Sequence, residues 1–343
     1  MIAHPLKQFV GALAGIVLAT VAAAPPDPAA AAEHIKIGTL KLAQYSPSFI
    51  AQEKGYFAVE GLDAELIMFD SAEPAAVAVV SGDLDFAVAG TSAGLYTLGG
   101  QGALKIIGGS FRETPGFRNF AFTVSNRAFA AGLKSYRDLP GHSMAVTQIG
   151  SPTHYNVALI AEKFGLDLKT IQVVPLQSIP NELSALKGGQ VDAGLIAATV
   201  VVPAAEHGDV KLLGWAGDET PWQFAVLVTG TKTANDRPAT VERFLRAYKK
   251  GARDYHDAFT GAGETRHDGP TAPAILALIA KFTGQPAERI ATGISYVDAQ
   301  ARLDVRDVLH QIAWYKSQGM VKGEVDGDQI IDKRYVIPLL AER

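Results

Sequence analysis

One pattern occurs twice in this chain and constrains its fold more than any other feature. Residues 80–88 (VSGDLDFAV) end a helix on Gly82, begin an apolar strand and lead into Ala89-Gly90-Thr91-Ser92; residues 187–196 (KGGQVDAGLI) repeat this order and lead into Ala197-Ala198-Thr199. Glycine at a helix end supplies the left-handed backbone of a C-cap. Small residues after a strand let a ligand approach the backbone, so the two copies predict two α/β lobes that clamp one small molecule.

Composition agrees with two lobes and excludes several kinds of protein. The 343 residues are too many for one compact core, and 48% of them are apolar, which is typical of a globular chain. A net charge of −4 offers no basic field for nucleic acid. The chain contains no cysteine, so disulfides, thiolate metal sites and a thiol nucleophile are impossible.

The N-terminus has the pattern of an export signal. Lys7 supplies a positive charge, residues 9–24 are apolar, and Ala30-Ala31-Ala32 offers a cleavage site before Glu33. The apolar run is about 16 residues, shorter than the ~20 that span a bilayer. We therefore expect a signal peptide over 1–32, cleavage, and a periplasmic protein, with free secretion as the alternative. Without a cysteine the protein is not lipid-anchored.

Strand and helix patterns alternate along the rest of the chain, which predicts largely parallel sheets flanked by helices. We expect lobe 1 to comprise residues 33–125 and 224–343 and lobe 2 residues 126–223, with hinge crossings near Ser125 and Gln223. From Pro238 onward the pattern is almost wholly helical, and this tail is expected to pack back on lobe 1. The predicted strands are 35–39, 64–69, 86–89, 104–108, 120–124, 143–146, 171–175 and 224–228.

At this point the residues are similar to those of a known family. Residues 51–57 (AQEKGYF), 60–66 (EGLDAEL) and 82–90 (GDLDFAVAG) resemble the N-terminal signature of ABC-transporter substrate-binding proteins of the nitrate/sulfonate/taurine type, and 138–141 and 192–193 are similar to its second lobe. The resemblance implies a type II-like periplasmic binding fold, no catalysis, and a monomer that delivers its solute to ABC permease and ATPase subunits.

Pyrimidine synthases of thiamine biosynthesis belong to the same superfamily. They carry a histidine before the first helix and a cysteine-rich iron motif, whereas this chain has Tyr45 at the aligned position and no cysteine. That departure argues against a synthase. Binding of a thiamine-precursor pyrimidine remains an alternative function.

Ligands of open α/β sheets bind at the carboxyl ends of the strands, and this rule selects candidate residues in lobe 1. Tyr45 offers an aromatic face, and the turn 90–92 offers N–H groups and hydroxyls to an anion. An ordinary loop at 44–46 and simple helix capping at Ser71 are the alternatives. The lobe 1 candidates are Gln44, Tyr45, Ser46, Ser71, Gly90, Thr91 and Ser92.

The same rule selects Ser151, Thr153 and His154 in lobe 2, and Thr199 by its place in the repeated pattern. Trp222 lies at the returning crossing, where it stacks on a ligand or packs in the hinge. Arg112 and Arg118 follow the fourth predicted strand, and each offers a bidentate guanidinium to an oxyanion or is an ordinary surface residue. These groups favour a sulfonate or an aromatic or aliphatic carboxylate as ligand.

An enzyme is the competing class of protein. Residues 90–94 (GTSAG) fit G-x-S-x-G between a strand and a helix, which makes Ser92 the nucleophile of a hypothetical secreted serine hydrolase with His310 and Asp304 or Asp307. Only two predicted strands precede the strand that leads into Ser92, and no HGGG-type segment is present, so we expect no enzyme. The eight histidines show no metal-binding spacing, and we predict neither a metal nor a cofactor.

Overall fold

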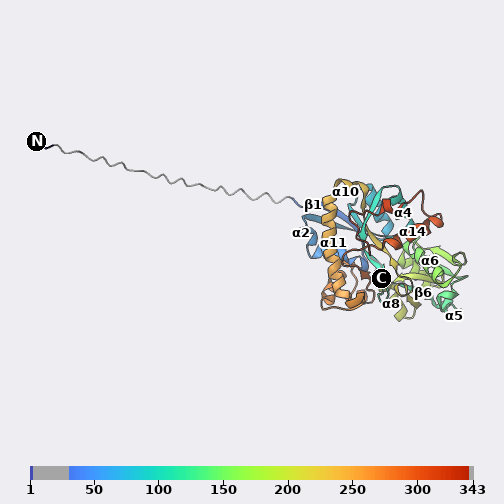
Figure 1. Ribbon diagram of the computed structural model, residues 1–343. Coiled ribbons are helices and arrows are strands. Elements are labelled where there is room, and N and C mark those ends of the chain that lie inside the picture. Colours follow the sequence, from blue (N-terminus) through green and yellow to red (C-terminus); the bar gives the residue numbers. More distant parts are fainter. Residues whose placement is uncertain (3–30, 340–343) are drawn as a thin grey trace. The chain divides into compact units, whose positions relative to one another are not determined.

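The structure is a computed structural model that describes residues 1–2 and 31–339 (Figure 1). The chain divides into two units, 1–31 and 32–343, and the fold described here is that of the second. Most of the predicted signal peptide therefore lies outside the described residues. Among the described helices, none is long and apolar enough to cross a membrane.

The first sheet has the order β2-β1-β3-β12-β4. β1 pairs in parallel with β2 and β3, and β12 pairs antiparallel with β3 and β4, so four strands share one direction. Because β3 and β12 consist of buried apolar residues, they form the centre of the sheet. The strands are β1 Glu33–Leu40, β2 Leu62–Phe69, β3 Phe86–Gly90, β4 Leu104–Gly109 and β12 Ala225–Gly230.

The second sheet repeats this topology. Read from β8 it has the order β8-β7-β9-β6-β10, and β6 is the one strand that runs against the other four. The match confirms that the repeated sequence pattern marks two similar, mostly parallel sheets. The strands are β6 Phe120–Ser125, β7 Ser143–Val146, β8 Gln172–Pro175, β9 Ala193–Ala197 and β10 Val210–Trp215.

A third, small sheet that the sequence did not predict connects the two. It has the order β11-β5-β13, with β5 Phe111–Glu113, β11 Trp222–Gln223 and β13 Tyr296–Val297. β5 leads into β6 and β11 leads into β12, so both crossings between the large sheets pass through it. β6 pairs within the second sheet although it precedes residue 126, and the lobe boundaries at 125 and 223 stay a prediction.

Helices flank the large sheets, as the alternating pattern predicted. The repeated helix ends differ in detail, since Gly82 is a left-handed C-cap at φ 85°, whereas Gly188 is right-handed and Gly189 takes the positive φ. The prediction missed helix α8, which is rich in valine and reads as a strand. The helices of the two lobes are α1 Ser46–Glu53, α2 Tyr56–Val59, α3 Ala72–Ser81, α4 Ala93–Gly100, α5 Asn126–Ala130, α6 Pro152–Phe164, α7 Ile179–Lys187, α8 Ala198–Glu206 and α9 Ala216–Glu219.

The C-terminal tail is mostly helical, and its helices contact elements of both lobes. The long helix α11 packs along α1, and its Phe244 stacks on Phe86 of β3 with ring centroids 4.0 Å apart. Helix α14 contacts α4, and its Trp314 meets the edge of His154 on α6. The tail helices are α10 Thr231–Asp236, α11 Pro238–Phe259, α12 Ala272–Thr283, α13 Ala287–Ala291, α14 Val305–Ser317 and α15 Gly327–Ile330, and single 3-10 turns span Ala43–Tyr45, Tyr136–Asp138, Leu168–Thr170 and Ala262–Glu264.

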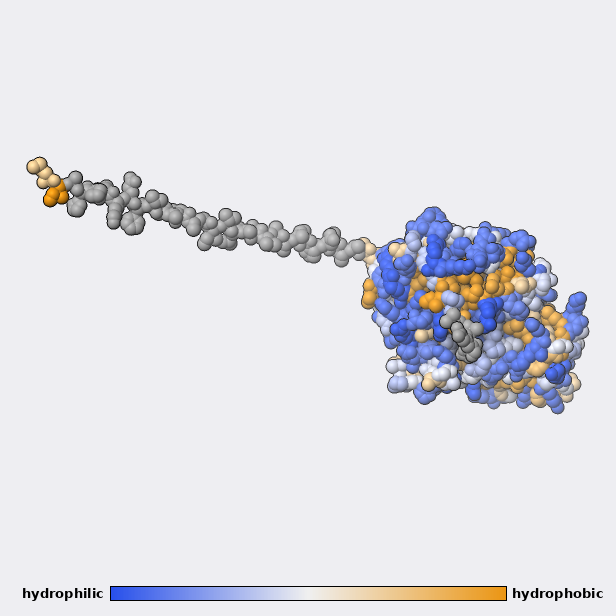
Figure 2. Space-filling view, in the orientation of Figure 1, coloured by the Kyte–Doolittle hydropathy of each residue, from blue (hydrophilic) through white to orange (hydrophobic). Residues whose placement is uncertain are grey.

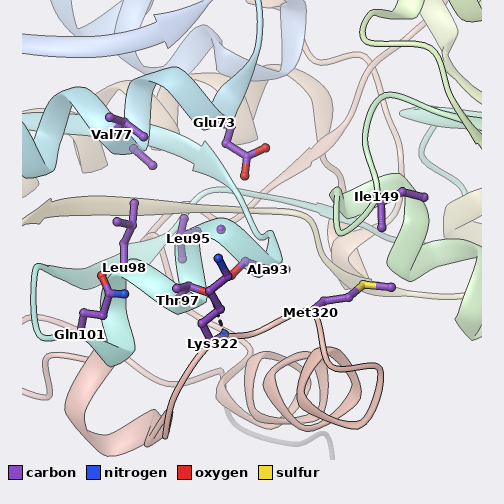
Figure 3. Close-up of a pocket in the computed structure, with 12 residues that line it drawn as sticks. Glu73, Val77, Ala93, Leu95, Thr97, Leu98, Gln101, Ile149, Met320 and Lys322 are labelled. Atoms are coloured by element: carbon purple, nitrogen blue, oxygen red, sulfur yellow. Dashed lines mark hydrogen bonds between the residues drawn. The ribbon is translucent and has the colours of Figure 1, made fainter.

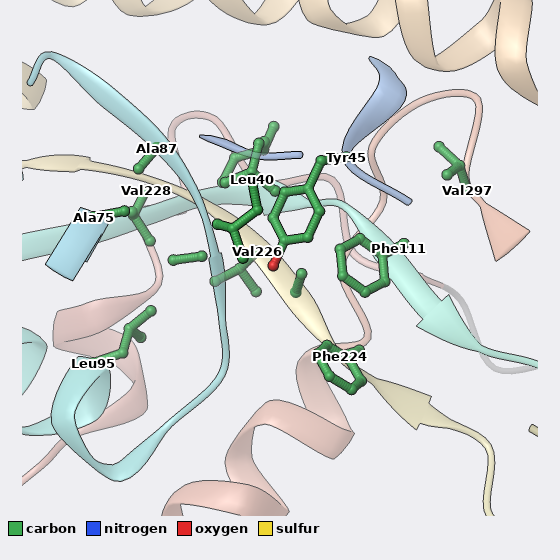
Figure 4. Close-up of a cluster of buried hydrophobic side chains, with 14 of the residues drawn as sticks. Leu40, Tyr45, Ala75, Ala87, Leu95, Phe111, Phe224, Val226, Val228 and Val297 are labelled. Carbon is green, nitrogen blue, oxygen red and sulfur yellow. The ribbon is translucent and has the colours of Figure 1, made fainter. Parts of the chain in front are cut away.

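The core extends from the first sheet to the small sheet. Tyr45, Phe111 and Phe224 lie together there, with the Tyr45 ring edge-on to Phe111 at 5.1 Å (Figure 4). The face in view in Figure 2 is largely hydrophilic at its rim and carries hydrophobic residues near its middle. Val77 and Ile149 are among the large apolar side chains left about half exposed.

Candidate functional site

The turns that follow β3 and β7 touch each other across the two lobes. The backbone N–H of Ala93 donates to the carbonyl of Gly150 at 2.9 Å. The Tyr315 hydroxyl on α14 donates to the carbonyl of Ser151 at 3.0 Å and lies 3.4 Å from that of Thr91. The turns at the carboxyl ends of β3 and β7 are therefore in contact, and α14 of the tail bridges them.

A cavity of about 530 Å³ opens beside this contact (Figure 3). It lies where the first turns of α3 and α4 meet the turn after β7, and residues 320 and 322 of the tail complete it. Most of its lining is apolar, with Glu73 and Lys322 as its charged residues. The lining consists of Glu73, Ala76, Val77, Ala93, Gly94, Leu95, Thr97, Leu98, Gln101, Ile149, Met320 and Lys322.

Glu73 has an unusual place in this cavity. It sits in the first turn of α3, and its carboxyl reaches α4 so closely that a β-carbon added at Gly94 would lie 2.1 Å from the Glu73 Oε1. Burial raises the pKa of the Glu73 carboxyl. Among the described residues no side chain pairs with it. Glycine at position 94 is thus what allows the carboxyl to occupy this space.

The predicted turns at 90–92 and 151–154 are brought together, but their side chains are turned into the protein. The Thr91 hydroxyl lies 3.2 Å from the carbonyls of Gln223 and Phe224 in the hinge region. Ser92 accepts from the N–H of Leu95 and so caps α4, and Ser151 caps α6 in the same way. The neighbours of the predicted residues, Ala93, Gly94 and Ile149, are the residues of these turns that line the cavity.

His154 and Thr153 also serve the local structure. The His154 Nδ1 accepts from the N–H of Gly150 at 3.0 Å, and burial lowers the pKa of this imidazole to about 4. The ring is therefore neutral at pH 7 and holds the turn that touches Ala93. The Thr153 hydroxyl pairs with that of Ser151 at 3.0 Å. In this conformation neither side chain faces the cavity.

The candidates after the first two strands are placed differently. Gln44, Tyr45 and Ser46 are buried, and burial raises the pKa of the Tyr45 phenol. Gly90 is buried in β3, opposite Ala225 of β12. Ser71 directly precedes α3 but makes no side-chain cap hydrogen bond, so the alternative of side-chain capping is wrong.

The two arginines do not enter the cavity. Arg112 lies on β5, with its guanidinium carbon 5.3 Å from the centre of the Tyr296 ring, and Arg118 lies equally close to Trp215. Arg118 lines a separate polar cavity of about 410 Å³ with Arg266, His267 and Asp268. Neither arginine lines the cavity that contains Glu73, so neither is placed to anchor a ligand there.

Thr199 and Trp222 are buried close to the hinge. Trp222 packs against Tyr155 and Phe224 at 5.3 and 4.9 Å between ring centroids, which corresponds to the predicted packing alternative. The Thr199 hydroxyl and the Trp222 Nε1 both lack a hydrogen-bond partner within the described part of the chain. Their contact with a ligand stays a prediction.

Sequence reasoning missed several residues that line the cavity. Glu73 sits in the first turn of α3, just after the loop that follows the second strand, and its spacing to Ala76 and Val77 places the three on one face of that helix. That helical spacing was the sequence signal that could have identified Glu73 as a lining residue. Met320 and Lys322 follow from no local pattern, because they reach the cavity through the packing of the tail.

The structure does not assemble the hydrolase alternative. The Ser92 hydroxyl accepts from the Leu95 N–H at 3.1 Å, and the His310 Nδ1 instead pairs with the Tyr155 hydroxyl at 2.7 Å. Within residues 1–2 and 31–339, no hydrogen bond joins Ser92 to a histidine. No group of three or more histidine, aspartate or glutamate side chains in the described ranges could hold a metal ion.

Two lobes of the same topology, joined by paired crossings and touching at their carboxyl edges, define the two-lobed binding-protein fold. The structure is similar to the periplasmic aliphatic sulphonate binding protein SsuA from Escherichia coli, with a TM-score of 0.68 and 19% identity over 91% of this chain and 95% of that one. It is also similar to the periplasmic nitrate-binding protein NrtA from Synechocystis PCC 6803, with a TM-score of 0.67 and 13% identity over 88% and 86%. These likenesses confirm the predicted fold.

The chain belongs to the NMT1/THI5-like family, whose model matches residues 43–258. A relative from Brucella abortus strain 2308, described provisionally as a binding protein, is 30% identical over 236 residues, 67% of this chain and 69% of its own. The predicted resemblance is thereby confirmed. The fold also occurs in the desulfurization enzyme DSZB, at a TM-score of 0.61 and 14% identity over 89% and 96%, so the fold alone does not exclude catalysis.

Proposed function

We propose that this protein is the periplasmic solute-binding component of an ABC importer and that it closes its two lobes on a small organic solute. The observation that carries this proposal is the hydrogen bond from Ala93 to Gly150, which joins the two lobes directly beside a cavity of about 530 Å³. A solute that contacts both sides binds the closed form better than the open form and shifts the population toward it. A permease then recognises the closed form.

The cellular setting forms part of the same proposal. A cleaved signal peptide over 1–32 delivers the protein to the periplasm, where it acts as a monomer with membrane-bound permease and ATPase subunits. We place the boundaries between the two lobes near residues 125 and 223, with β6 Phe120–Ser125 pairing in the second sheet, so that both crossings serve as the hinge. The names of the structural neighbours, which include sulphonate- and nitrate-binding periplasmic proteins, support this setting.

The proposed ligand carries an anionic group, a sulfonate or carboxylate, on an apolar body. Within the cavity this assignment is supported by the Lys322 ammonium and by the apolar side chains around it. The predicted candidates at 71, 90–92 and 151–154 do not line the cavity; we propose that they hold the neighbouring turns, whose residues do line it. We assign no catalytic role to Ser92, because its hydroxyl is engaged in capping α4.

Thermal unfolding against a panel of alkanesulfonates, aliphatic and aromatic carboxylates, nitrate and pyrimidines tests this function. A solute at a hundred times its dissociation constant adds about 2.7 kcal/mol to the free energy of unfolding. We expect a sulfonate or carboxylate to raise the midpoint by several degrees. If no compound shifts the midpoint of protein that was unfolded and refolded to remove bound solute, the binding function is wrong.

Substitution of Gly150 tests whether closure is part of binding. The Gly150→Ala variant places a β-carbon 2.9 Å from that of Ala93 and so holds the lobes apart. We expect its affinity for the solute found above to fall about tenfold or more in calorimetry. Position 150 also has φ +81°, so the substitution carries a strain of roughly 1–2 kcal/mol.

Gly165→Ala is the matched control. Gly165 is the C-cap of α6, the helix that begins just after Gly150. It has φ +65°, and a β-carbon there meets nothing within 4 Å. Both variants should lose similar stability, but only Gly150→Ala should lose affinity. Equal affinities of the two variants would show that contact between these turns plays no part in binding.

A further inference from the structure

One face of helix α14 is hydrogen-bonded to elements of both lobes. The helix contacts α4, beside the first sheet, and also α6, which follows strand β7 of the second sheet (Figure 1). On the first side, the Tyr96 hydroxyl on α4 donates to the Gln311 Oε1 at 2.9 Å. On the second side, the Tyr155 hydroxyl on α6 lies 2.7 Å from the His310 Nδ1 and 3.2 Å from the Asp307 Oδ1. A single helix therefore connects the two lobes.

The same helix face holds the strand by which the chain returns from the second large sheet to the first. The backbone N–H of Gln223 on β11 donates to the Asp307 Oδ2 at 2.8 Å. The Gln311 side-chain amide donates to the Gln223 carbonyl at 2.8 Å and to the Asp307 Oδ2 at 2.6 Å. Because residues 307, 310 and 311 are spaced three and four positions apart, they lie on one side of α14. Both lobes and one crossing thus meet at this side of the helix.

Asp307 lies at the centre of these contacts and is partly buried. Burial raises the pKa of its carboxyl to about 6, although hydrogen bonds from Gln223 and Gln311 oppose the shift. No lysine or arginine is among the ionisable groups that face Asp307 directly or through Tyr155 and His310. These groups are Asp304, His310 and Tyr315 on α14, Tyr155 and Glu162 on α6, and Tyr96 on α4.

The Tyr155 hydroxyl has one proton and two neighbours that can accept it. When Asp307 is ionised, the hydroxyl donates to the carboxylate and must accept from His310. When Asp307 carries a proton, its carboxyl donates to Tyr155, which donates to the His310 Nδ1. The second arrangement keeps both contacts and avoids the cost of shielding a carboxylate from water.

We infer that α14 is a strap that holds the two lobes together before any solute binds, and that a proton on Asp307 tightens this strap. The inference rests on the proposed function and adds its regulation. Opening of the lobes moves α6 away from α14, breaks the contacts of the Tyr155 hydroxyl and lets water reach Asp307. The strapped form therefore takes up a proton that the open form releases, so a lower pH favours the strapped form.

The direction and size of the pH effect follow from this difference. In the strapped form the pKa of Asp307 is about 6, whereas that of an ordinary aspartate is 3.8. The strapped form therefore gains stability relative to the open form as the pH falls through 6, and the gain is complete below 3.8. Between pH 8 and pH 5 the ratio of open to strapped molecules should fall by up to about tenfold.

The absence of cysteine from the chain allows each lobe to be labelled at a chosen position. Val59→Cys on α2 and Lys169→Cys on the turn 168–170 replace exposed residues of different lobes. Single-molecule energy transfer between dyes at these two positions counts open and strapped molecules. The measurement uses protein that was unfolded and refolded to remove bound solute, at pH 8 and at pH 5.

Three further substitutions assign the effect to its residues. Tyr155→Phe keeps the ring and removes the hydroxyl, so the ratio of open to strapped molecules should rise about three- to tenfold. Asp307→Asn keeps hydrogen-bonding atoms but cannot ionise, so the ratio should be the same at pH 8 and pH 5. Tyr136→Phe is the control and should leave the ratio unchanged, because the Tyr136 hydroxyl is buried and has no partner among the described residues.

Each part of the inference can fail separately. A Tyr155→Phe protein with the same ratio as the parent at both pH values would overturn the strap. A pH dependence that persists in Asp307→Asn would overturn the role of the proton.

The proposed function is tested independently, because the labelled protein is measured without solute. If no compound of the solute panel binds but Tyr155→Phe opens the lobes, the proposed function fails and the strap stands. If a solute binds the parent and Tyr155→Phe equally well and their lobes open alike, the function stands and the strap is wrong. Weaker binding by Tyr155→Phe, in proportion to its larger open fraction, supports both.

Discussion

Replacing Glu182 by methionine should raise the free energy of unfolding at pH 8 by about 2–4 kcal/mol, the largest gain that we expect from any single substitution. Glu182 is fully buried on α7, beside the buried Ala185 and Leu186 of the same helix. Neither of its carboxyl oxygens has a partner among the described residues. Methionine has a similar length and no polar atoms, so it fills the space without the penalty of burying a carboxyl group.

The gain should depend on pH in a definite direction. Burial raises the pKa of the Glu182 carboxyl to about 8, whereas it is near 4.5 in an unfolded chain. Between these two values the folded protein holds a proton that the unfolded chain releases, so stability falls as pH rises through this window. Below pH 4.5 both states are protonated and this loss disappears. Chemical unfolding of both proteins at pH 5 and pH 8 measures the difference.

Two further variants make the interpretation specific. Glu182→Gln removes the titration but keeps buried polar atoms, so it should flatten the pH dependence while recovering less stability than methionine does. Glu206→Met changes an exposed glutamate on α8 and should leave stability within about 0.5 kcal/mol of the parent. A Glu182→Met variant that is less stable than the parent at pH 8 would mean that the carboxyl has a favourable partner in the folded protein.

The sequence predicted the fold wherever local signals were strong. Gly82 ends a helix and the residues after it form a buried strand, as the pattern indicated, and the second copy did the same with Gly189 in place of Gly188. The small hinge sheet was not predictable in this way. Its strands are two or three residues long and exist only because distant segments, such as those of Trp222 and Glu113, pair in space.

The predicted turns at 90–92 and 151–154 adjoin residues that line the cavity, although none of the predicted site residues is itself part of the lining. The rule for strand ends selects these turns, but it does not say which way each side chain points. Ser92 faces α4 as a cap, so the next residues, Ala93 and Gly94, face the cavity instead. Lys322 comes from a segment more than two hundred residues away in the chain, and only tertiary packing brings it there. The sequence therefore did not predict two things: the direction of each side chain, and the position of the tail against the cavity.

The largest loss should come from adding a single methyl group at Gly251. This glycine lies in the middle of α11, where α11 crosses α1, and a β-carbon would sit 2.2 Å from the carbonyl oxygen of Pro47 and 3.0 Å from the backbone nitrogen of Ala51. Both atoms belong to the backbone and cannot rotate away, so the two helices must separate. We expect Gly251→Ala to lower the free energy of unfolding by about 3 kcal/mol.

That expected loss runs against the intrinsic preference of a helix. Alanine inside a helix is favoured over glycine by roughly 0.5–1 kcal/mol, so a destabilised variant can only reflect the contact with α1. Arg253→Ala, two residues along the same helix at an exposed position, is the control and should change stability little. Because α1 begins at Ser46, its displacement should also shift Tyr45 and its contact with Phe111. Thermal unfolding of the two variants decides the matter, since a Gly251→Ala protein as stable as the parent would show that α1 and α11 do not approach this closely.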